Sequence, residues 1–375
     1  MSIDHRSHLR TLPIFLVSQS GHACLIVLSP RWPGRLGGTI ALCILIQVAS
    51  ASAYRDTSED ARRLAYYSLG HYVMCQAFSV FLFNWLTDPI HDFRHEHDHT
   101  PPAELPFLRR VTHIPPRPTE PRWRCLRQTL LSAFRCFLFI DLAQVYQRSN
   151  PLFSRQDMDL RSQGLFMLPL NIVARFGSVV AMIAMEYSLL AATCVALGVS
   201  SPRHWPDIYG KWSDSYTVRS IHLQLTAGIG KACCRALGLQ PGTWVSSYTQ
   251  LYVGFAVSGF LHCGGDLMVD PSLFGASFPF YISQAVAITF EDAVIGIVRR
   301  TGVKFPQPLA RVVGYAWAIL WLCISAPWHI NWTLKAGVVD TVRVPVSLID
   351  LIAPNLGAFA TSFTPSIAMS FRSED

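Results

Sequence analysis

Long apolar stretches, separated by polar and basic segments, dominate the hydrophobic pattern of this chain. A membrane-spanning helix needs about 20 mostly apolar residues. Candidate stretches lie near residues 11–29, 37–54, 69–87, 130–147, 165–198, 249–268, 278–297 and 311–329. The pattern therefore predicts an all-α polytopic membrane protein with about eight spans, within a range of about seven to nine. We expect residues 1–375 to form one membrane domain.

Two of these stretches need a separate interpretation. The first follows the basic residues Arg6 and Arg10 and has no small-residue cleavage site, so we interpret it as an uncleaved signal-anchor helix. The stretch at 165–198 is too long for one simple span. A tilted helix, two short helices, or a re-entrant piece followed by a span all remain possible for it.

The composition supports the membrane class. Hydrophobic residues make up 51% of the chain and charged residues only 15%, against about 25% charged residues in an ordinary soluble domain. These values exclude a disordered chain, a fibrous protein and a typical cytosolic enzyme. The 10 cysteines contain no Cys-x-x-Cys pair, so nothing indicates a zinc or thioredoxin-like site.

The basic residues gather in loops between the apolar stretches. The net charge is +7, and its location in loops favours contact with anionic lipid or a charged cofactor over nucleic acid. Because cytoplasmic loops carry excess Lys and Arg, we place loop 88–129 on the cytosolic side. If 165–198 crosses the membrane once, loops 199–248 and 298–310 lie on the same side. Eight spans would put both termini in the lumen. The sequon Asn331-Trp332-Thr333 would then be lumenal, which makes Asn331 a candidate glycosylation site.

The most informative polar residues lie inside the stretch near 249–268. Ser258, His262 and Asp266 are spaced four residues apart, so on a helix they share one face. The neighbouring glycines would let another helix or a substrate approach closely. Ionisable residues inside a span are costly and mark candidate functional sites. Because a neutral imidazole accepts protons at neutral pH, His262 is a candidate general base; the alternative is a structural His bonded to a neighbouring helix.

A second candidate site is the polar, aromatic and basic loop segment 209–222. Arg219 and Lys211 could bind phosphates, Arg through paired bonds and Lys as a point charge. Trp212 or Tyr216 could stack on an adenine. The alternative is an ordinary interfacial loop with aromatic and cationic anchors.

A third feature is the cluster of His91, His95, His97 and His99. Clustered His residues can bind metal, and a metal-dependent membrane hydroxylase is the alternative function that they suggest. No second or third His box accompanies this cluster in the sequence. We therefore interpret it as a solvated loop and expect no metal site.

Several short motifs, in a fixed order, resemble the wax-synthase-like branch of the membrane-bound O-acyltransferase superfamily in its fungal form. That form includes acetyltransferases of terpenoid and meroterpenoid pathways. The resemblance covers roughly residues 70–335. Its motifs are Asp88-Pro89 with 92–94, 106–107 and 109–110, then 214–219, 258–262 and 324–328.

The resemblance implies transfer of an acyl group, in particular acetyl, from acyl-CoA to a hydroxyl of an apolar, terpenoid-like alcohol in the endoplasmic reticulum membrane. His262 would be the base, and Asp266 or Ser258 would orient it. Arg219 and Lys211 would bind the CoA phosphates from the cytosolic side. No permanently bound cofactor is needed, since the thioester is already activated. A long-chain wax-ester synthase and a non-catalytic membrane protein stay as alternatives.

Overall fold

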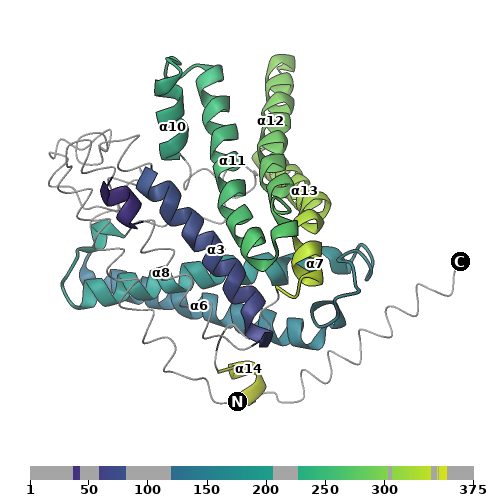
Figure 1. Cartoon of the computed structure of the whole chain (residues 1–375). Coiled ribbons are helices and arrows are strands. Elements are labelled where there is room, and N and C mark those ends of the chain that lie inside the picture. Colours follow the sequence, from purple (N-terminus) through teal and green to yellow (C-terminus); the bar gives the residue numbers. More distant parts are fainter. Residues whose placement is uncertain are drawn as a thin grey trace, which may run out of the picture. The chain divides into compact units, whose positions relative to one another are not determined.

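The computed structural model describes residues 37–42, 59–81, 120–205, 227–302, 306–338, 344 and 346–352 (Figure 1). Every regular element in these ranges is helical, which confirms the predicted all-α class. The chain forms two compact units that alternate along the sequence. Unit 1 comprises Met1–Pro115 and Val218–Lys304, and unit 2 comprises Pro116–Thr217 and Phe305–Asp375. The prediction of a single membrane domain stays a prediction.

Unit 1 is organised around helix α11 (Trp244–Val269). Helices α3 (Glu59–Phe81), α10 (Ala227–Ala236) and α12 (Phe278–Thr301) all pack against it. The short 3₁₀ helix η7 (Pro271–Leu273) lies between α11 and α12. Thr243 caps α11, since its Oγ1 accepts a hydrogen bond from the Ser246 amide.

Unit 2 contains α6 (Arg122–Ser149), packed along α8 (Ser178–Ala196). Two short 3₁₀ helices follow them in sequence: η3 (Pro151–Phe153) comes after α6, and η5 (Pro202–His204) comes after α8. Helix α13 (Gln307–Lys335), which carries Pro327 in its interior, contacts α7 (Met167–Ile172).

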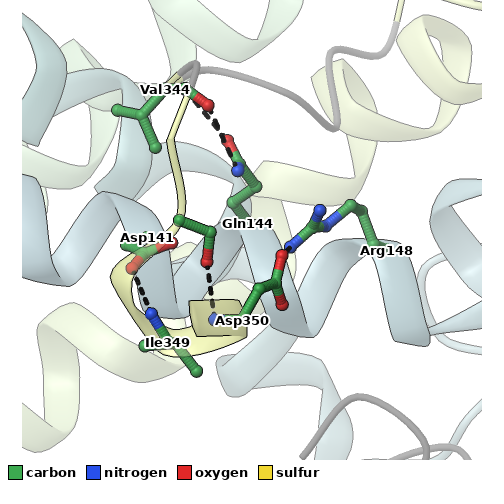
Figure 2. Close-up of polar contacts among 7 residues, drawn as sticks. Asp141, Gln144, Arg148, Val344, Ile349 and Asp350 are labelled. Carbon is green, nitrogen blue, oxygen red and sulfur yellow. Dashed lines mark hydrogen bonds and ion pairs between the residues drawn. The ribbon is translucent and has the colours of Figure 1, made fainter. Parts of the chain in front are cut away.

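The C-terminal end of the described chain is held on α6 by polar contacts. Figure 2 shows Asp141, Gln144 and Arg148 of α6 facing the segment from Val344 through α14 (Leu348–Ile352). Gln144 Oε1 accepts from the Val344 amide at 3.0 Å, and Asp141 Oδ2 accepts from the Ile349 amide at 3.0 Å. The exposed Arg148 guanidinium pairs with Asp350.

Five helices among the described residues are long and apolar enough to cross a membrane. They are Arg122–Ser149, Met167–Ala196, Trp244–Val269, Pro271–Thr301 and Gln307–Lys335. They coincide with the last five predicted stretches. The predicted stretch at 69–87 overlaps α3, which begins at Glu59. The stretch at 11–29 and most of the one at 37–54 lie outside the described residues, so the count of eight spans stays a prediction.

Large apolar side chains cover the outer surfaces of these helices. Trp123, Val312 and Ile297 are each more than half exposed, at 79%, 63% and 61%. A soluble monomer rarely exposes contiguous apolar surface of this kind. The exposure fits helices whose outer faces contact lipid.

The long stretch at 165–198 forms one uninterrupted helical run. Helix α7 continues directly into the π-helical turn η4 (Val173–Gly177) and then into α8. The Ser178 hydroxyl bonds back to the Arg175 carbonyl inside this run. Of the alternatives left open by the sequence, the structure therefore shows a single long helix with one wide turn. A helix longer than the bilayer core can be accommodated by tilting or bending.

Polar side chains inside unit 2 bond to one another or to main-chain carbonyls. Asn150 Nδ2 donates to Asn171 at 2.9 Å and to Tyr146 at 2.9 Å. Buried Arg175 donates to the Val338 carbonyl at 2.7 Å, and Gln147 donates to Ala174. Such pairing is what an apolar interior requires of polar groups.

Candidate active site around His262

Glycines bring α3 and α11 into close contact in unit 1. A Cβ atom on Gly70 of α3 would overlap the main chain of α11 at Gly264. A Cβ on Gly265 would lie 2.6 Å from Cδ2 of the Tyr67 ring and 2.8 Å from the Tyr67 carbonyl oxygen. Both distances are shorter than real Cβ contacts allow, so these positions require glycine. The glycines predicted to thin this helix therefore admit a neighbouring helix.

This close approach places two polar residues of α3 beside His262. The hydroxyl of Tyr67 lies 2.7 Å from Nδ1 of His262. The His71 ring, one turn further along α3, lies 4.2 Å from the His262 ring, centroid to centroid. The two side chains come from a segment about 195 positions earlier in the sequence.

Helix α12 supplies a third ring. Tyr281 stacks on the His262 imidazole with ring centroids 4.3 Å apart and an interplanar angle of 13°. Gly259 of α11 makes room on this side, because a Cβ there would lie 2.7 Å from the Phe278 ring. The imidazole is therefore held by three aromatic rings from two helices.

Asp266 has a different partner from the one that the sequence suggested. It is fully buried, and its carboxylate accepts from the Ser277 amide at 2.8 Å and from the Ser277 hydroxyl at 2.6 Å. Both carboxylate oxygens thus bond to the residue that precedes α12. The hydrogen bond at Nδ1 of His262 belongs to Tyr67, and Asp266 instead ties the end of α11 to the start of α12.

The connection between these helices is closed by a second carboxylate. Asp270 accepts from the Ser272 amide at 2.8 Å and from its hydroxyl at 2.7 Å, which caps η7. These bonds hold the pKa of Asp270 below its ordinary value. Together, Asp266 and Asp270 fix the turn that sets the position of Tyr281.

Ser258 lies one turn before His262 on the same helix and is half-buried. The structure places it on the predicted face of α11, as the spacing of four residues requires. Its predicted role in orienting the imidazole stays a prediction. The hydrogen bond at Nδ1 of the imidazole comes from Tyr67 on another helix.

The proposed donor-binding residues lie outside the described part of the chain. This applies to Arg219, Lys211, Trp212 and Tyr216, and also to the His cluster at 91–99. Among the described residues, no group of three His, Cys, Asp or Glu side chains is placed to hold a metal ion. The roles predicted for these segments stay predictions.

Asn331 lies inside α13 in unit 2 rather than in a loop. Its Nδ2 donates to Asp159 and its Oδ1 accepts from the Leu160 amide at 2.8 Å. Attaching a glycan to Nδ2 would require these contacts to open. Glycosylation at Asn331 stays a prediction, and the geometry gives it no support.

The tautomer of His262 decides what the site can do. A neutral imidazole carries its proton on one nitrogen and accepts with the other, and a phenol can both donate and accept. If Nδ1–H donates to the Tyr67 oxygen, Nε2 is the unprotonated nitrogen, which can accept a proton. If Tyr67 donates to Nδ1, Nε2 becomes a hydrogen-bond donor. The first arrangement is that of a general base, and the second can only stabilise negative charge.

Tyr67, His71 and Tyr281 were not predicted from the sequence. One signal was present: Tyr67 and His71 are four residues apart, with Gly70 between them, and therefore share a helix face. Tyr67 fell just outside the predicted stretch at 69–87, although α3 includes it. Tyr281 had no such signal, because its contact with His262 depends on how α12 packs on α11.

Comparison with known proteins gives a consistent result. Residues 205–283, which include His262, match the membrane bound O-acyl transferase family. No solved structure matches the chain.

Several curated relatives are acetyltransferases. The acetyltransferase eriL of Hericium erinaceus is 27% identical over 79% of this chain and 84% of its own length. The acetyltransferase ple2 of Rhodocybe pseudopiperita is 31% identical, and TRI7 of Fusarium sporotrichioides 27%. These two alignments cover 57% and 62% of this chain, but only 58% and 60% of the relatives. The chain is thus similar to fungal acetyltransferases, and residues 205–283 match the membrane bound O-acyl transferase family.

Proposed function

We propose that this protein is a membrane O-acyltransferase that moves an acetyl group from acetyl-CoA to a hydroxyl of an apolar, terpenoid-like alcohol. The acetyl donor is supported by the relatives that are named acetyltransferases. The apolar acceptor is supported by the position of His262 and Tyr281 on helices that are long and apolar enough to cross a membrane. The endoplasmic reticulum is the proposed location.

One observation carries the mechanism: Nδ1 of His262 bonds to the Tyr67 hydroxyl, and the imidazole stacks on Tyr281 with the tilted His71 ring nearby. A base must be held within reach of the proton that it removes. Tyr67 can fix the imidazole with Nε2 as the accepting nitrogen, which is the atom that would face the acceptor alcohol.

The proposed reaction moves one proton and one acetyl group. His262 Nε2 takes the hydroxyl proton while the alcohol oxygen bonds to the thioester carbonyl carbon. The carbon–sulfur bond breaks, and the leaving CoA thiolate recovers the proton from the imidazolium. The products are the acetate ester and CoA, and His262 returns to its neutral form. No metal ion has a role in these steps.

The donor is proposed to approach from the cytosolic side. Arg219 and Lys211 would pair with its phosphates, and Trp212 or Tyr216 would stack on the adenine. This assignment is supported by the match at residues 205–283, which includes all four positions.

The test is an assay on membranes containing the full chain, with labelled acetyl-CoA or palmitoyl-CoA and a panel of terpenoid alcohols. We expect an acetate ester to form and His262→Ala to lower its formation by about 10²–10⁴-fold. Protein level and membrane insertion should be unchanged. Formation of palmitate esters alone would instead identify a long-chain wax-ester synthase, and activity of His262→Ala within a few-fold of the parent would contradict the assignment of the base.

A further inference from the structure

The strongest unassigned feature of the site is the hydroxyl of Tyr67. It comes from α3, outside the segment that matches the family, and it bonds to His262 Nδ1 at 2.7 Å. Intramembrane hydrogen bonds of this kind are kept only where packing presents the two groups to each other. Here, the packing is set by Gly70, Gly264 and Gly265, at which a side chain would collide with the opposite helix.

We infer that Tyr67 is a positioning residue for His262: its hydroxyl oxygen accepts a hydrogen bond from Nδ1–H and thereby keeps Nε2 unprotonated toward the alcohol. The inference rests on the proposed function, because it assigns a partner to the proposed base. Tyr67 takes the orienting role first expected of Asp266, since both carboxylate oxygens of Asp266 bond to Ser277.

Neighbouring rings limit how the imidazole of His262 can turn. Tyr281 stacks on it with ring centroids 4.3 Å apart, and the His71 ring lies tilted at 4.2 Å. The imidazole plane is therefore constrained, and Nδ1 is directed at the Tyr67 oxygen. A phenol oxygen can accept a hydrogen bond at this distance.

Neighbouring groups that the structure describes have contacts of their own. His71 Nε2 lies 3.5 Å from the Cys75 thiol on its own helix. Helix α10 contacts α11 near Ser246 and Gln250, which lie about three turns or more before His262. Because the Tyr67 hydroxyl bonds to Nδ1, loss of this hydroxyl should allow the imidazole to change its tautomer or to rotate.

The experiment compares Tyr67→Phe with Tyr252→Phe in the full chain. Tyr252 is the matched control, because its hydroxyl also joins two helices of unit 1, bonding to Thr289 at 3.2 Å, but lies almost three turns from His262. At matched amounts of folded, detergent-extracted protein, Tyr67→Phe should lower kcat by about 10-fold, the size of one lost hydrogen bond on the base. KM for acetyl-CoA should change little, and Tyr252→Phe should behave as the parent.

Two further readouts separate positioning from a purely structural role. A more acidic phenolic acceptor needs less help in losing its proton, so the loss caused by Tyr67→Phe should shrink with it. Tyr67→Gln keeps an acceptor oxygen and should recover part of kcat. A structural role would lower folded protein and affect all acceptors equally, which would overturn the inference.

The activity of His262→Ala distinguishes a failure of the inference about Tyr67 from a failure of the proposed base. If His262→Ala is inactive and Tyr67→Phe keeps kcat within about twofold of the parent, only the inference about Tyr67 fails. If His262→Ala stays active, the proposed base fails and the role of Tyr67 fails with it. If Tyr67→Phe does not fold, the absence of any recovery in Tyr67→Gln at matched folded protein overturns the inference.

Discussion

At the scale of single residues, Asp266 and His262 lie on one helix but form hydrogen bonds with different residues, Ser277 and Tyr67. The Asp266 carboxylate accepts two hydrogen bonds from Ser277, and the site is fully buried. Asp266→Ala would leave the Ser277 amide without its acceptor, which costs about 1–3 kcal/mol for a buried group. We expect a lower thermal midpoint of the extracted protein, with kcat per folded molecule reduced less than in His262→Ala.

Ser277→Ala provides the control for this prediction. It removes the hydroxyl donor but keeps the amide bond to Asp266, so its thermal midpoint should fall less. If Asp266→Ala were fully stable and yet inactive, Asp266 would act on the imidazole directly, as its spacing from His262 first suggested.

The sequence predicted His262 because an ionisable residue in an apolar, glycine-rich stretch is conspicuous. It did not predict Tyr67, since the partner of a residue on α11 depends on which helix packs there and in which register. The same limit applies to Asp266. Its spacing from His262 is right for a shared face, but Ser277 is positioned by the turn through η7, which no periodicity describes.

At the scale of elements, the crossing of α3 over α11 depends on glycine. A Cβ at Gly70 would overlap the Gly264 main chain, and a Cβ at Gly264 would collide with the Met74 side chain. We therefore expect Gly264→Val to separate the two helices, lowering both the yield of folded protein and the activity. The measurement is the folded fraction by fluorescence-detected size-exclusion chromatography, with activity assayed on the same samples.

Gly296 is the matched control for this substitution. It lies within α12, and a Cβ there would meet nothing within 4 Å. Gly296→Ala should be neutral or slightly stabilising, by about 0.5–1 kcal/mol, because alanine restricts the unfolded chain and favours a helix. If both variants folded equally well, the close contact at Gly264 would not matter for the packing of α3.

The positions of the described spans could be predicted because hydropathy depends mainly on composition. The predicted stretches 249–268, 278–297 and 311–329 each fall inside an observed helix. The π-helical turn at Val173–Gly177 could not be predicted. It changes the hydrogen-bond pattern by one residue per turn while leaving the apolar pattern of the run intact.

At the scale of the whole molecule, the chain alternates between its two units, and hydropathy contains no information about that order. Charge does predict which helix ends share a side of the membrane. Helix α6 begins with Arg122, Arg124 and Arg127, and α12 ends with Arg299 and Arg300. Basic helix ends tend to face the cytosol. Residues 165–198 form one helical run, which would cross the membrane once. These basic ends are therefore predicted to share the cytosolic side.

This topology can be tested with epitope tags inserted singly into described loops. A tag after Gln240, between α10 and α11, and a tag after Gly302 should be accessible to antibody when only the plasma membrane is permeabilised. Tags after Asp157 and after Phe274 should become accessible only when all membranes are dissolved, because one span separates each from a cytosolic loop. Each tagged protein should retain acyl transfer, which shows that the tag has not altered the fold. Equal accessibility of the tags after Asp157 and Gln240 would mean that the run from Met167 to Ala196 does not cross the membrane, and the predicted cytosolic position of Arg219 and Lys211 would then lose its basis.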